Sequence, residues 1–454
     1  MNETVKKICG FFTKERCSFL IVSFIFGLIC CNVRLFWDDE TFYGNVHGQG
    51  ILYCLKAAAD YMNVSSRVLI NSVLYTVLSR GTAALGIYMG LCMFVMQSAF
   101  RELFAPRGGM TSCLFISFIC MLFPVSLLYD TGWAATSVTY FCTVSWGLAA
   151  LVPVRKAYDG RKISIPGYIL YTLALLMGAN LEQMTVLLIA CLICASVMLT
   201  AVKKLRPVFI YIETLLAAAS GIFIFTWQGN ANRMEAETAN WFPTFGMLSG
   251  LDKADMGIST TLRWLLFDSN LFIIVILFYM TVFIFRKYKS LFFRTVSLIP
   301  LSVTVLTGPL LDITKKLFPY IEHFCSEIPR EGLISPGSEN GAARLVLMLM
   351  VMMCVGAEII LLCDNVYQTA AGLTLAVTGA ATRAALGFSP TIYASGVRTF
   401  TVLTVCIMGI GIMLYEGNME KQPDRERFDG LSGAVFVWGV IFGLVNLFFS
   451  VKMR

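Results

Sequence analysis

Residues 183–201 read QMTVLLIACLICASVMLTA, nineteen residues without one Lys, Arg, Asp or Glu. This length matches the roughly 20 apolar residues that an α-helix needs to cross the hydrocarbon core of a bilayer. A helix that is apolar on all sides cannot present a polar face to water. The stretch therefore predicts a membrane-spanning helix, and similar runs recur along the whole chain.

These apolar runs fill much of the 454-residue chain, of which 57% is hydrophobic and only 14% is charged. The mean hydropathy is +0.74, whereas soluble domains contain only about 45–50% apolar residues. We therefore expect an all-α, polytopic integral membrane protein in which residues 1–454 form a single transmembrane domain of about 11–13 helices. The expected spans lie near residues 17–36, 81–100, 112–129, 133–152, 165–179, 183–201, 207–227, 264–285, 291–311, 343–363, 368–386, 399–415 and 431–450.

Lys and Arg residues gather in short clusters between the apolar runs, and they account for the net charge of +7. The amino terminus is basic (Lys6, Lys7, Lys14 and Arg16) and precedes an apolar run that we interpret as a retained first helix. A cytoplasmic amino terminus then puts the basic clusters in the cytoplasm, as the positive-inside rule requires. These clusters lie at residues 101–107, 155–162, 203–206, 286–294 and 421–427. Because they are scattered between apolar runs, topology explains the net charge better than nucleic-acid binding does. We expect membrane lipids, and no nucleic acid, among the partners of the chain.

The same alternation places a different set of segments outside the cytoplasm, and these hold most of the polar residues. They are residues 37–80, 130–133, 180–183, 228–263, 312–342 and 387–398. We expect three of them, the first outer loop 37–80 with an interfacial helix and the loops 228–263 and 387–398, to share one extracytoplasmic cavity.

Cysteine and histidine indicate neither a disulfide framework nor a multi-histidine metal centre. Most of the 15 cysteines lie inside apolar runs, where a thiol behaves as a small hydrophobe. Cys191 and Cys194 form a C-x-x-C pattern, but inside a span this pattern indicates packing. The two histidines, His47 and His323, are too few for such a metal site.

The stretch Trp37-Asp38-Asp39-Glu40-Thr41-Phe42-Tyr43 follows the first expected span and contains three consecutive acids. Neighbouring carboxylates raise each other's pKa and hold protons or cations well. If the segment is helical, Asp39 and Tyr43 share a face, and shielding by the ring lifts the pKa of Asp39 toward neutral. We expect Asp39, ahead of Asp38, to be a catalytic base. A divalent cation at these two acids is the one cofactor left open, and a solvated helix end is the alternative.

Arg67 opens a segment of residues 60–80 whose apolar positions have helical spacing, typical of a helix lying in the membrane interface. Its planar guanidinium suits a phosphate group, although an arginine that only snorkels to the interface is an equal alternative. Glu182 and Gln183 begin a later span. Glu182 is either a binding residue or a favourable charge at a helix N-terminus.

Two further outer segments combine glycine with polar side chains. Residues 228–237 contain Gly229, Asn230 and Arg233, and residues 387–398 contain Tyr393 and Arg398. Glycine lets backbone amides approach an anion closely. We therefore expect both segments to bind substrate, with connectors or structural turns as the alternative, and Arg67, Arg233 and Arg398 to bind an anion.

Taken together, these stretches resemble a little-characterised bacterial family of polytopic, glucosyltransferase-like membrane proteins. The resemblance covers almost the whole chain. It rests on Asp38-Asp39 with Tyr43, Ser65-Ser66-Arg67, Glu182-Gln183, Gly229-Asn230 with Arg233, and residues 389–399. The chain departs from the family pattern at Ser65-Ser66, where Asn-Gly is expected. More widely, the chain resembles the class C (GT-C) glycosyltransferases.

This resemblance implies an inverting glycosyltransferase in a bacterial cytoplasmic (inner) membrane. The enzyme would move a hexose from a polyprenyl-phosphate-sugar donor to a cell-surface glycan or lipid acceptor on the extracytoplasmic face. Asp38 or Asp39 would deprotonate the acceptor, and arginines would steady the departing phosphate. Glu40, Tyr43, Glu182, Gln183, Asn230 and Tyr393 would complete the substrate site.

Other functions also fit the pattern. Glu213 and Glu358 lie within expected spans, where acids can relay protons, so a transporter or flippase of a lipid-linked or small polar substrate is the main rival. A surface-glycan polymerase or ligase would use the same donors. A membrane scaffold without catalytic activity is the remaining alternative.

Overall fold

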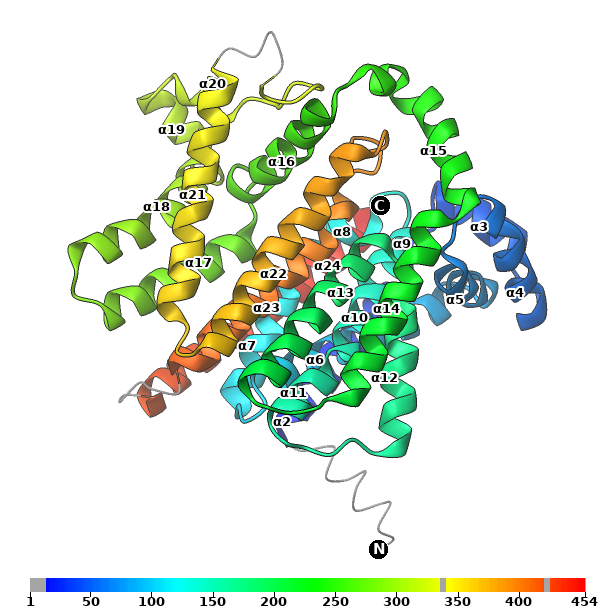
Figure 1. Cartoon of the computed structure of the whole chain (residues 1–454), viewed down its shortest axis with the longest axis horizontal. Coiled ribbons are helices and arrows are strands. Elements are labelled where there is room, and N and C mark those ends of the chain that lie inside the picture. The colour runs from blue at the N-terminus through cyan, green and yellow to red at the C-terminus, as the bar shows by residue number, and fades with distance from the viewer. Residues whose placement is uncertain (1–13, 335–339, 420–424, 454) are drawn as a thin grey trace, which may run out of the picture. The chain divides into compact units, whose positions relative to one another are not determined.

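The computed structural model describes residues 14–334, 340–419 and 425–453 (Figure 1). Within these ranges the chain forms helices and no β-strand, which confirms the expected all-α class. Lys6, Lys7 and Lys421, which belong to the predicted cytoplasmic charges, lie outside the described residues.

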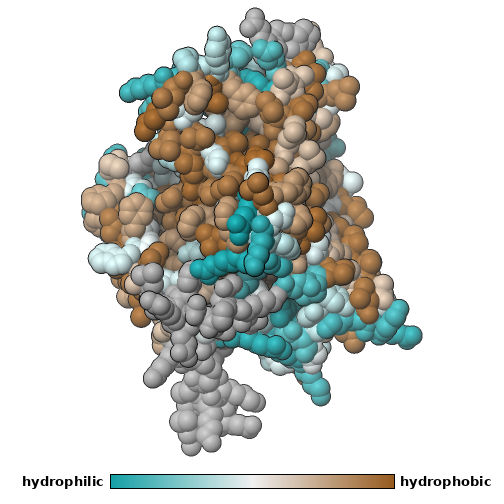
Figure 2. Space-filling view, turned by 90° about the vertical axis from the view of Figure 1, so that its left-hand side faces the viewer, coloured by the Kyte–Doolittle hydropathy of each residue, from teal (hydrophilic) through white to brown (hydrophobic). Residues whose placement is uncertain are grey.

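Seven helices in the described ranges are long and apolar enough to cross a membrane, or up to nine if each of two bent helix pairs forms one span. This number is compatible with a multi-pass membrane protein. The seven are Thr82–Phe104, Trp133–Tyr158, Glu182–Val202, Val208–Thr226, Gly341–Leu362, Val397–Met419 and Ser432–Met453. Hydrophobic residues also cover much of the face drawn in Figure 2, as expected for surface that faces lipid.

The expected 11–13 spans exceed this number because several apolar runs form shorter or bent helices. Three of them correspond to the short apolar helices Cys17–Cys30, Met110–Met121 and Ile165–Gly178. Two others belong to the bent pairs, which turn by 72° at residues 267–270 and by 93° at residues 308–310. The run near 368–386 forms α22 (Val366–Ala384), which is not among the candidate spans.

The chain forms two compact units. Unit 1 comprises residues 1–232, 397–402 and 420–454, and unit 2 comprises residues 233–396 and 403–419. Each unit contains candidate spans, so the single transmembrane domain stays a prediction. The expected cavity shared by residues 37–80, 228–263 and 387–398 involves both units and also stays a prediction.

Unit 1 is built mainly from long apolar helices. They are α2 (Lys14–Cys30), α6 (Thr82–Phe104), α7 (Met110–Met121), α10 (Thr143–Ala150), α11 (Val152–Tyr158), α12 (Ile165–Gly178), α13 (Glu182–Val197), α14 (Val208–Thr226) and α24 (Arg425–Met453). Helices α2 and α6 pack at backbone distance, because a Cβ atom added to Gly86 would lie 2.5 Å from the Gly27 carbonyl oxygen. Small residues allow this close approach between membrane helices.

The two ends of α6 carry different kinds of residue. This helix has 23 residues and is therefore about 34 Å long. Beside its C-terminal end, an ion pair joins Arg161 to Glu102 at 2.9 Å, and Lys203 donates to the Tyr158 carbonyl at 2.9 Å. These contacts bring together three basic segments, residues 101–107, 155–162 and 203–206. We call this region the basic end of unit 1. The opposite end, where α6 begins, is the polar end.

Residues 37–80 lead to the polar end and are almost entirely helical. They form α3 (Asp38–Val46), α4 (Ile51–Asp60), η1 (Tyr61–Asn63) and α5 (Val68–Ser79). Arg67 is the N-cap residue of α5, which confirms the helix expected to begin there. Helix α4 exposes apolar side chains, among them Leu52, which is 84% exposed. Such a surface fits the expected position in a membrane interface.

Four short elements also belong to unit 1. They are α8 (Ser126–Tyr129), α9 (Trp133–Thr136), the π-helix η2 (Ser137–Cys142) and the 3₁₀-helix η6 (Val397–Phe400). A second π-helix, η3 (Met198–Val202), follows α13. The helices α9, η2, α10 and α11 run on as one candidate span, whose side chains are mostly buried.

Unit 2 contains the bent helices. Its elements are most of α15 (Gln228–Trp241), η4 (Pro243–Met247), α16 (Gly250–Leu266), α17 (Leu271–Lys287), α18 (Leu291–Thr307), α19 (Leu311–Leu317), α20 (Ile321–Cys325), α21 (Gly341–Leu362), α22, η5 (Ala385–Phe388) and most of α23 (Thr401–Met419). Most of residues 228–263, expected as a loop, is therefore helical. In α15 the run of Ala, Met and Glu at residues 231–237 favours helix.

Candidate functional site

Asp39 lies in the first turn of α3, and its side chain is fully buried. Its two carboxylate oxygens accept hydrogen bonds from the backbone N–H groups of Ala134 at 3.1 Å and Ala135 at 2.8 Å. The carboxylate therefore caps the N-terminus of α9, where the unpaired N–H groups of a helix favour negative charge. Gly132 before this helix has φ +137°, and a Cβ atom there would lie 2.5 Å from Asp39 Oδ1. Only glycine leaves room for the acid.

Burial raises the pKa of Asp39 to about 6, although the N–H groups of Ala135, Ala134 and Trp133 act in the opposite direction. The charge of Asp38 adds a smaller upward effect. The direction agrees with the rise expected from the sequence. The cause is the burial of the carboxyl group. The ring of Tyr43 stacks on His47, with 4.3 Å between ring centroids.

Asp38 and Glu40 differ from Asp39 because both are exposed. The backbone N–H of Asp38 donates to the Thr131 carbonyl at 3.3 Å, which ties the start of α3 to the turn before α9. Of the two aspartates, Asp38 has the side chain that a substrate can reach. Asp39 is buried and Asp38 is exposed, and which of the two is the base stays a prediction.

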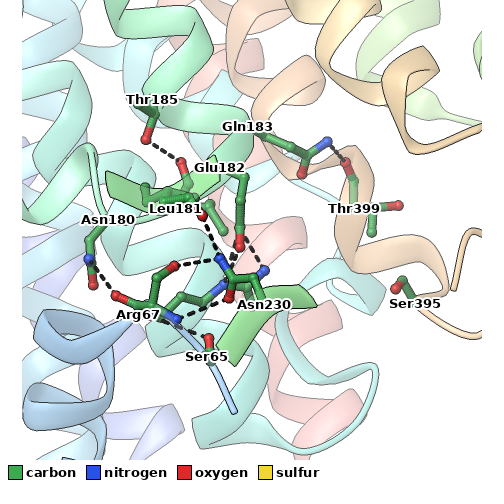
Figure 3. Close-up of polar contacts among 12 residues, drawn as sticks. Ser65, Arg67, Asn180, Leu181, Glu182, Gln183, Thr185, Asn230, Ser395 and Thr399 are labelled. Atoms are coloured by element: carbon green, nitrogen blue, oxygen red, sulfur yellow. Dashed lines mark hydrogen bonds and ion pairs between the residues drawn. The ribbon is translucent and has the colours of Figure 1, made fainter. Parts of the chain in front are cut away.

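Arg67 and Glu182 form a two-pronged ion pair (Figure 3). The Nε atom of Arg67 lies 3.2 and 3.1 Å from the two carboxylate oxygens, and Nη2 lies 2.7 Å from one of them. Burial alone would lower the pKa of Arg67, but Glu182 and the hydroxyl of Tyr140 raise it above its ordinary value. The guanidinium is thus held in place as a permanent cation.

Two asparagines hold the backbone around Arg67 (Figure 3). The Asn180 side-chain oxygen accepts from the N–H groups of Leu69 and Ile70 at 3.0 and 3.1 Å and so caps α5. Asn230 accepts from the Ser66 N–H at 3.0 Å and donates to the Ser66 hydroxyl at 2.9 Å. These bonds anchor the segment that presents Arg67.

The position before Asn230 requires glycine because the backbone there lies close to another segment. A Cβ atom at Gly229 would lie 2.3 Å from the Met62 carbonyl oxygen, so the two backbones meet at a distance that no other residue allows. The Trp227 indole donates to the same carbonyl at 2.6 Å. The Gly-Asn pair therefore holds residues 62–66 in place from the start of a helix, and the expectation that it binds substrate stays a prediction.

Residues 397–400 lie beside the same end of unit 1. The Gln183 side chain donates to the Thr399 carbonyl at 3.0 Å (Figure 3). Arg398 donates to the Thr131 hydroxyl, and its Nε lies 3.9 Å from a carboxylate oxygen of Asp130. The Arg398 side chain is only 15% exposed, and its Nε atom is buried without a hydrogen-bond partner among the described residues.

These contacts connect most of the predicted site residues. Asp38 and Arg398 both contact Thr131, Thr399 next to Arg398 contacts Gln183, and Gln183 is adjacent to Glu182. Glu182 pairs with Arg67, and Ser66 next to Arg67 pairs with Asn230. We call this connected set the polar belt. Its members are Asp38, Asp39, Ser66, Arg67, Asp130, Thr131, Asn180, Glu182, Gln183, Asn230, Arg398 and Thr399.

Arg233 and Tyr393 belong to unit 2 and make other contacts. Arg233 lies 3.6 Å from Glu237, one turn further along α15. The Tyr393 hydroxyl donates to the Arg330 carbonyl at 3.0 Å, and burial raises the pKa of Tyr393 to about 12. Both contacts stabilise structure within unit 2.

The environment of Asp39 does not suit a divalent cation, because its oxygens face N–H donors and a cation needs acceptor atoms around it. Across residues 14–334, 340–419 and 425–453, no group of three or more His, Cys, Asp or Glu side chains is arranged to hold a metal ion.

Sequence reasoning missed four members or neighbours of the belt. Asp130, Thr131 and Asn180 stand in short turns between apolar runs, and their polarity was the available signal. Tyr140 gave no signal, because it lies inside an apolar run and reaches Arg67 only through the fold. It belongs to η2, and π-helical turns are frequent at functional sites.

No protein-family model, curated protein or solved structure matches this chain.

Proposed function

We propose that the chain is a membrane glycosyltransferase. It transfers a hexose from a polyprenyl-phosphate-sugar donor to a cell-surface glycan or lipid acceptor. The observation that carries this proposal is the polar belt, in which two arginines, Arg67 and Arg398, and an exposed acid, Asp38, lie at one end of unit 1. This combination of charges matches the needs of a reaction whose leaving group is a phosphate.

In the proposed reaction, the acceptor hydroxyl attacks the anomeric carbon of the donor sugar from the side opposite the phosphate. The bond from this carbon to the phosphate oxygen breaks, so the configuration inverts and polyprenyl phosphate leaves with the electron pair. Asp38 takes the hydroxyl proton, because it is the exposed aspartate of the pair. General base catalysis of this kind contributes about 10²–10⁴-fold.

Arg67 and Arg398 are proposed to stabilise the charge that develops on the departing phosphate. Each guanidinium is oriented in advance, Arg67 by Glu182 and Arg398 by Thr131, so little side-chain entropy is lost on binding. Asp39 is a positioning residue, because it fixes the start of α3 against α9 and thereby places Asp38.

The positive-inside rule supports the orientation in the membrane. The basic end of unit 1 collects residues 101–107, 155–162 and 203–206, which contain nine Lys and Arg but only two acids. We therefore propose that this end and the amino terminus are cytoplasmic. The polar belt is then on the extracytoplasmic face of a bacterial inner membrane.

The test is reconstitution of the purified protein in lipid vesicles with radiolabelled polyprenyl-phosphate-hexoses and a mixture of lipid acceptors. Sugar transfer, or release of polyprenyl phosphate, is the expected result. Asp38→Asn should lower this rate about 10²-fold or more. Asp60→Asn, a change at an exposed acid outside the belt, is the matched control. Full activity of the Asp38→Asn protein would disprove the assignment of the base.

A second candidate function is transport of a lipid-linked or small polar substrate. Glu213 in α14 and Glu358 in α21 are fully buried, and their carboxylate oxygens have no hydrogen-bond partner among the described residues. Acids in such positions are often functional in membrane proteins. Substrate uptake into vesicles that is lost in Glu213→Gln or Glu358→Gln, without any sugar transfer, would favour this candidate.

A further inference from the structure

The basic end of unit 1 contains cations that its own ion pairs do not use. Arg161 is paired with Glu102 and Asp159, and Lys203 donates to the Tyr158 carbonyl. In contrast, the neighbouring Lys162, Lys204 and Arg206 are exposed, and none of the three forms an ion pair with a described residue. Three positive charges therefore remain available in two connections, residues 159–164 and 203–207.

These two connections lie side by side. The bond between Lys203 Nζ and the Tyr158 carbonyl joins them at 2.9 Å, and Lys203 Nζ also lies 3.6 Å from the centre of the Tyr158 ring. After the connections, in the first turns of the two helices, Tyr168 of α12 packs edge-on against Phe209 of α14, with 4.7 Å between ring centroids. The three cations thus stand close to the place where α12 and α14 both begin.

Two helix N-termini add to the positive potential there. Helix α12 has 14 residues and begins directly after the first connection, and α14 has 19 residues and begins directly after the second. Some of their first N–H groups are already bonded, since the Ser164 hydroxyl accepts from Gly167 and the Arg206 carbonyl accepts from Val208. The N-terminus of a helix carries a partial positive charge that attracts anions. Lys204 has φ +57°, a left-handed backbone conformation that is uncommon for any residue other than glycine. Such conformations cluster at ligand-binding segments.

Apolar side chains continue from the cations along both helices. Ile165 and Ile169 on α12 are 78% and 60% exposed, and Val208 on α14 is 61% exposed. A soluble anion such as phosphate would not contact this apolar surface. A phospholipid would, because it has both a charged headgroup and acyl chains. Basic sites between membrane helices are known to hold anionic lipid headgroups.

We propose that the connections 159–164 and 203–207 bind the headgroup of an anionic phospholipid, whose acyl chains lie along the first turns of α12 and α14. Lys162, Lys204 and Arg206 contact the phosphate, and Ile165, Ile169 and Val208 contact the chains. This site is at the opposite end of unit 1 from the polar belt. The lipid-binding proposal therefore does not depend on which reaction the polar belt performs.

The test measures binding of dioleoyl phosphatidylglycerol to the full-length protein in detergent by native mass spectrometry, with dioleoyl phosphatidylcholine as the neutral lipid. The variant Lys162→Gln/Lys204→Gln/Arg206→Gln removes the three cations. The control Arg34→Gln/Lys56→Gln/Arg80→Gln removes the same charge from exposed residues at the other end of α6. We expect phosphatidylglycerol affinity to fall at least tenfold in the first variant and to stay unchanged in the control.

Equal loss in both variants would overturn the proposal, because the effect would then come from net charge. Equal affinity for the two lipids would overturn it as well. Competition by millimolar inorganic phosphate would show a site for a soluble anion and would also contradict it. If the triple variant does not fold, Arg206→Glu tests the same point at one exposed residue.

Discussion

Arg67 and Glu182, which are 115 residues apart in the sequence, join the N-termini of α5 and α13 through two parallel prongs, with a shortest distance of 2.7 Å. Their side chains are only 19% and 28% exposed. Partly shielded ion pairs of this geometry contribute more to the free energy of unfolding than surface pairs do. Removal of one partner is costly because the other charge is then left unpaired. The pair therefore connects the segment that follows α4 to a membrane-spanning helix.

A double-mutant cycle with Arg67→Gln and Glu182→Gln should show this coupling in the free energy of unfolding in detergent. We expect about 1.5–3 kcal/mol, the range for hydrogen bonds to charged groups. The matched control is the pair Arg233 and Glu237, at 3.6 Å on one helix and with side chains 36% and 25% exposed. That pair should give only about 0.3–0.5 kcal/mol. Equal couplings in the two cycles would contradict the prediction.

Gly229→Ala should destabilise unit 1 strongly, because its new methyl group would collide with the Met62 carbonyl oxygen at 2.3 Å. Both atoms belong to backbone, which moves less easily than a side chain. We expect a loss of about 1–3 kcal/mol or more, as for overpacked sites, measured as a lower midpoint of thermal unfolding. Gly44→Ala is the control, since nothing lies within 4 Å of its Cβ position in α3. An alanine there should stabilise the helix by about 0.5–1 kcal/mol.

The pKa of Asp39 predicts how stability depends on pH. Burial raises this pKa from 3.8 to about 6, so the folded protein binds the proton more tightly than the unfolded chain. The stabilisation from this proton is complete below about pH 4 and is lost as the pH rises through about 6. Thermal unfolding between pH 4 and 7 should therefore show a declining midpoint.

In Asp39→Asn this part of the pH dependence should disappear, and the protein should be less stable throughout, because an amide cannot accept both N–H bonds of α9. Asp60→Asn, at an exposed acid, should keep the wild-type pH profile. An unchanged profile in Asp39→Asn would show that another group titrates in this range.

Arg398→Lys should weaken binding of a polyprenyl-phosphate-sugar, because an ammonium group cannot reproduce the planar fork of a guanidinium. We expect a loss of about tenfold in affinity, on the order of 1.4 kcal/mol, measured with a fluorescent donor analogue. Arg233→Lys tests the third arginine that the sequence indicated. An equal loss there would place Arg233 in the donor site, and no loss would leave it as a partner of Glu237 alone.

The apolar runs predicted the helices well, because an uncharged stretch such as residues 183–201 has few alternatives to a helix in a membrane. Local spacing also predicted the start of α5 at Arg67. Local rules failed for the bends, since the 93° turn between α18 and α19 depends on how the flanking helices pack. The expected 11–13 spans exceed the seven to nine candidate spans because some apolar runs form short or bent helices.

The candidate site could be predicted as a set of residues but not as a set of roles. The sequence indicates that Asp38 and Asp39 are important, yet only the contact with Ala134 and Ala135 distinguishes them. Glu182 was expected to bind substrate or to favour its helix, and in the structure it holds Arg67. Each role depends on a partner about 100 residues away, which no local pattern reports.

The cap that Asp39 forms on α9 also constrains how the protein is made. Its partners Ala134 and Ala135 follow it by 95 and 96 residues. At a synthesis rate of about 5–20 residues per second, the ribosome needs roughly 5 to 20 s to add them. During this interval α3 lacks the helix end that it caps, so we expect residues 37–60 to reach their final position only after the second candidate span, Trp133–Tyr158, has been made. A nascent chain paused before residue 133 should therefore leave residues 37–60 open to protease, and release of the pause should protect them.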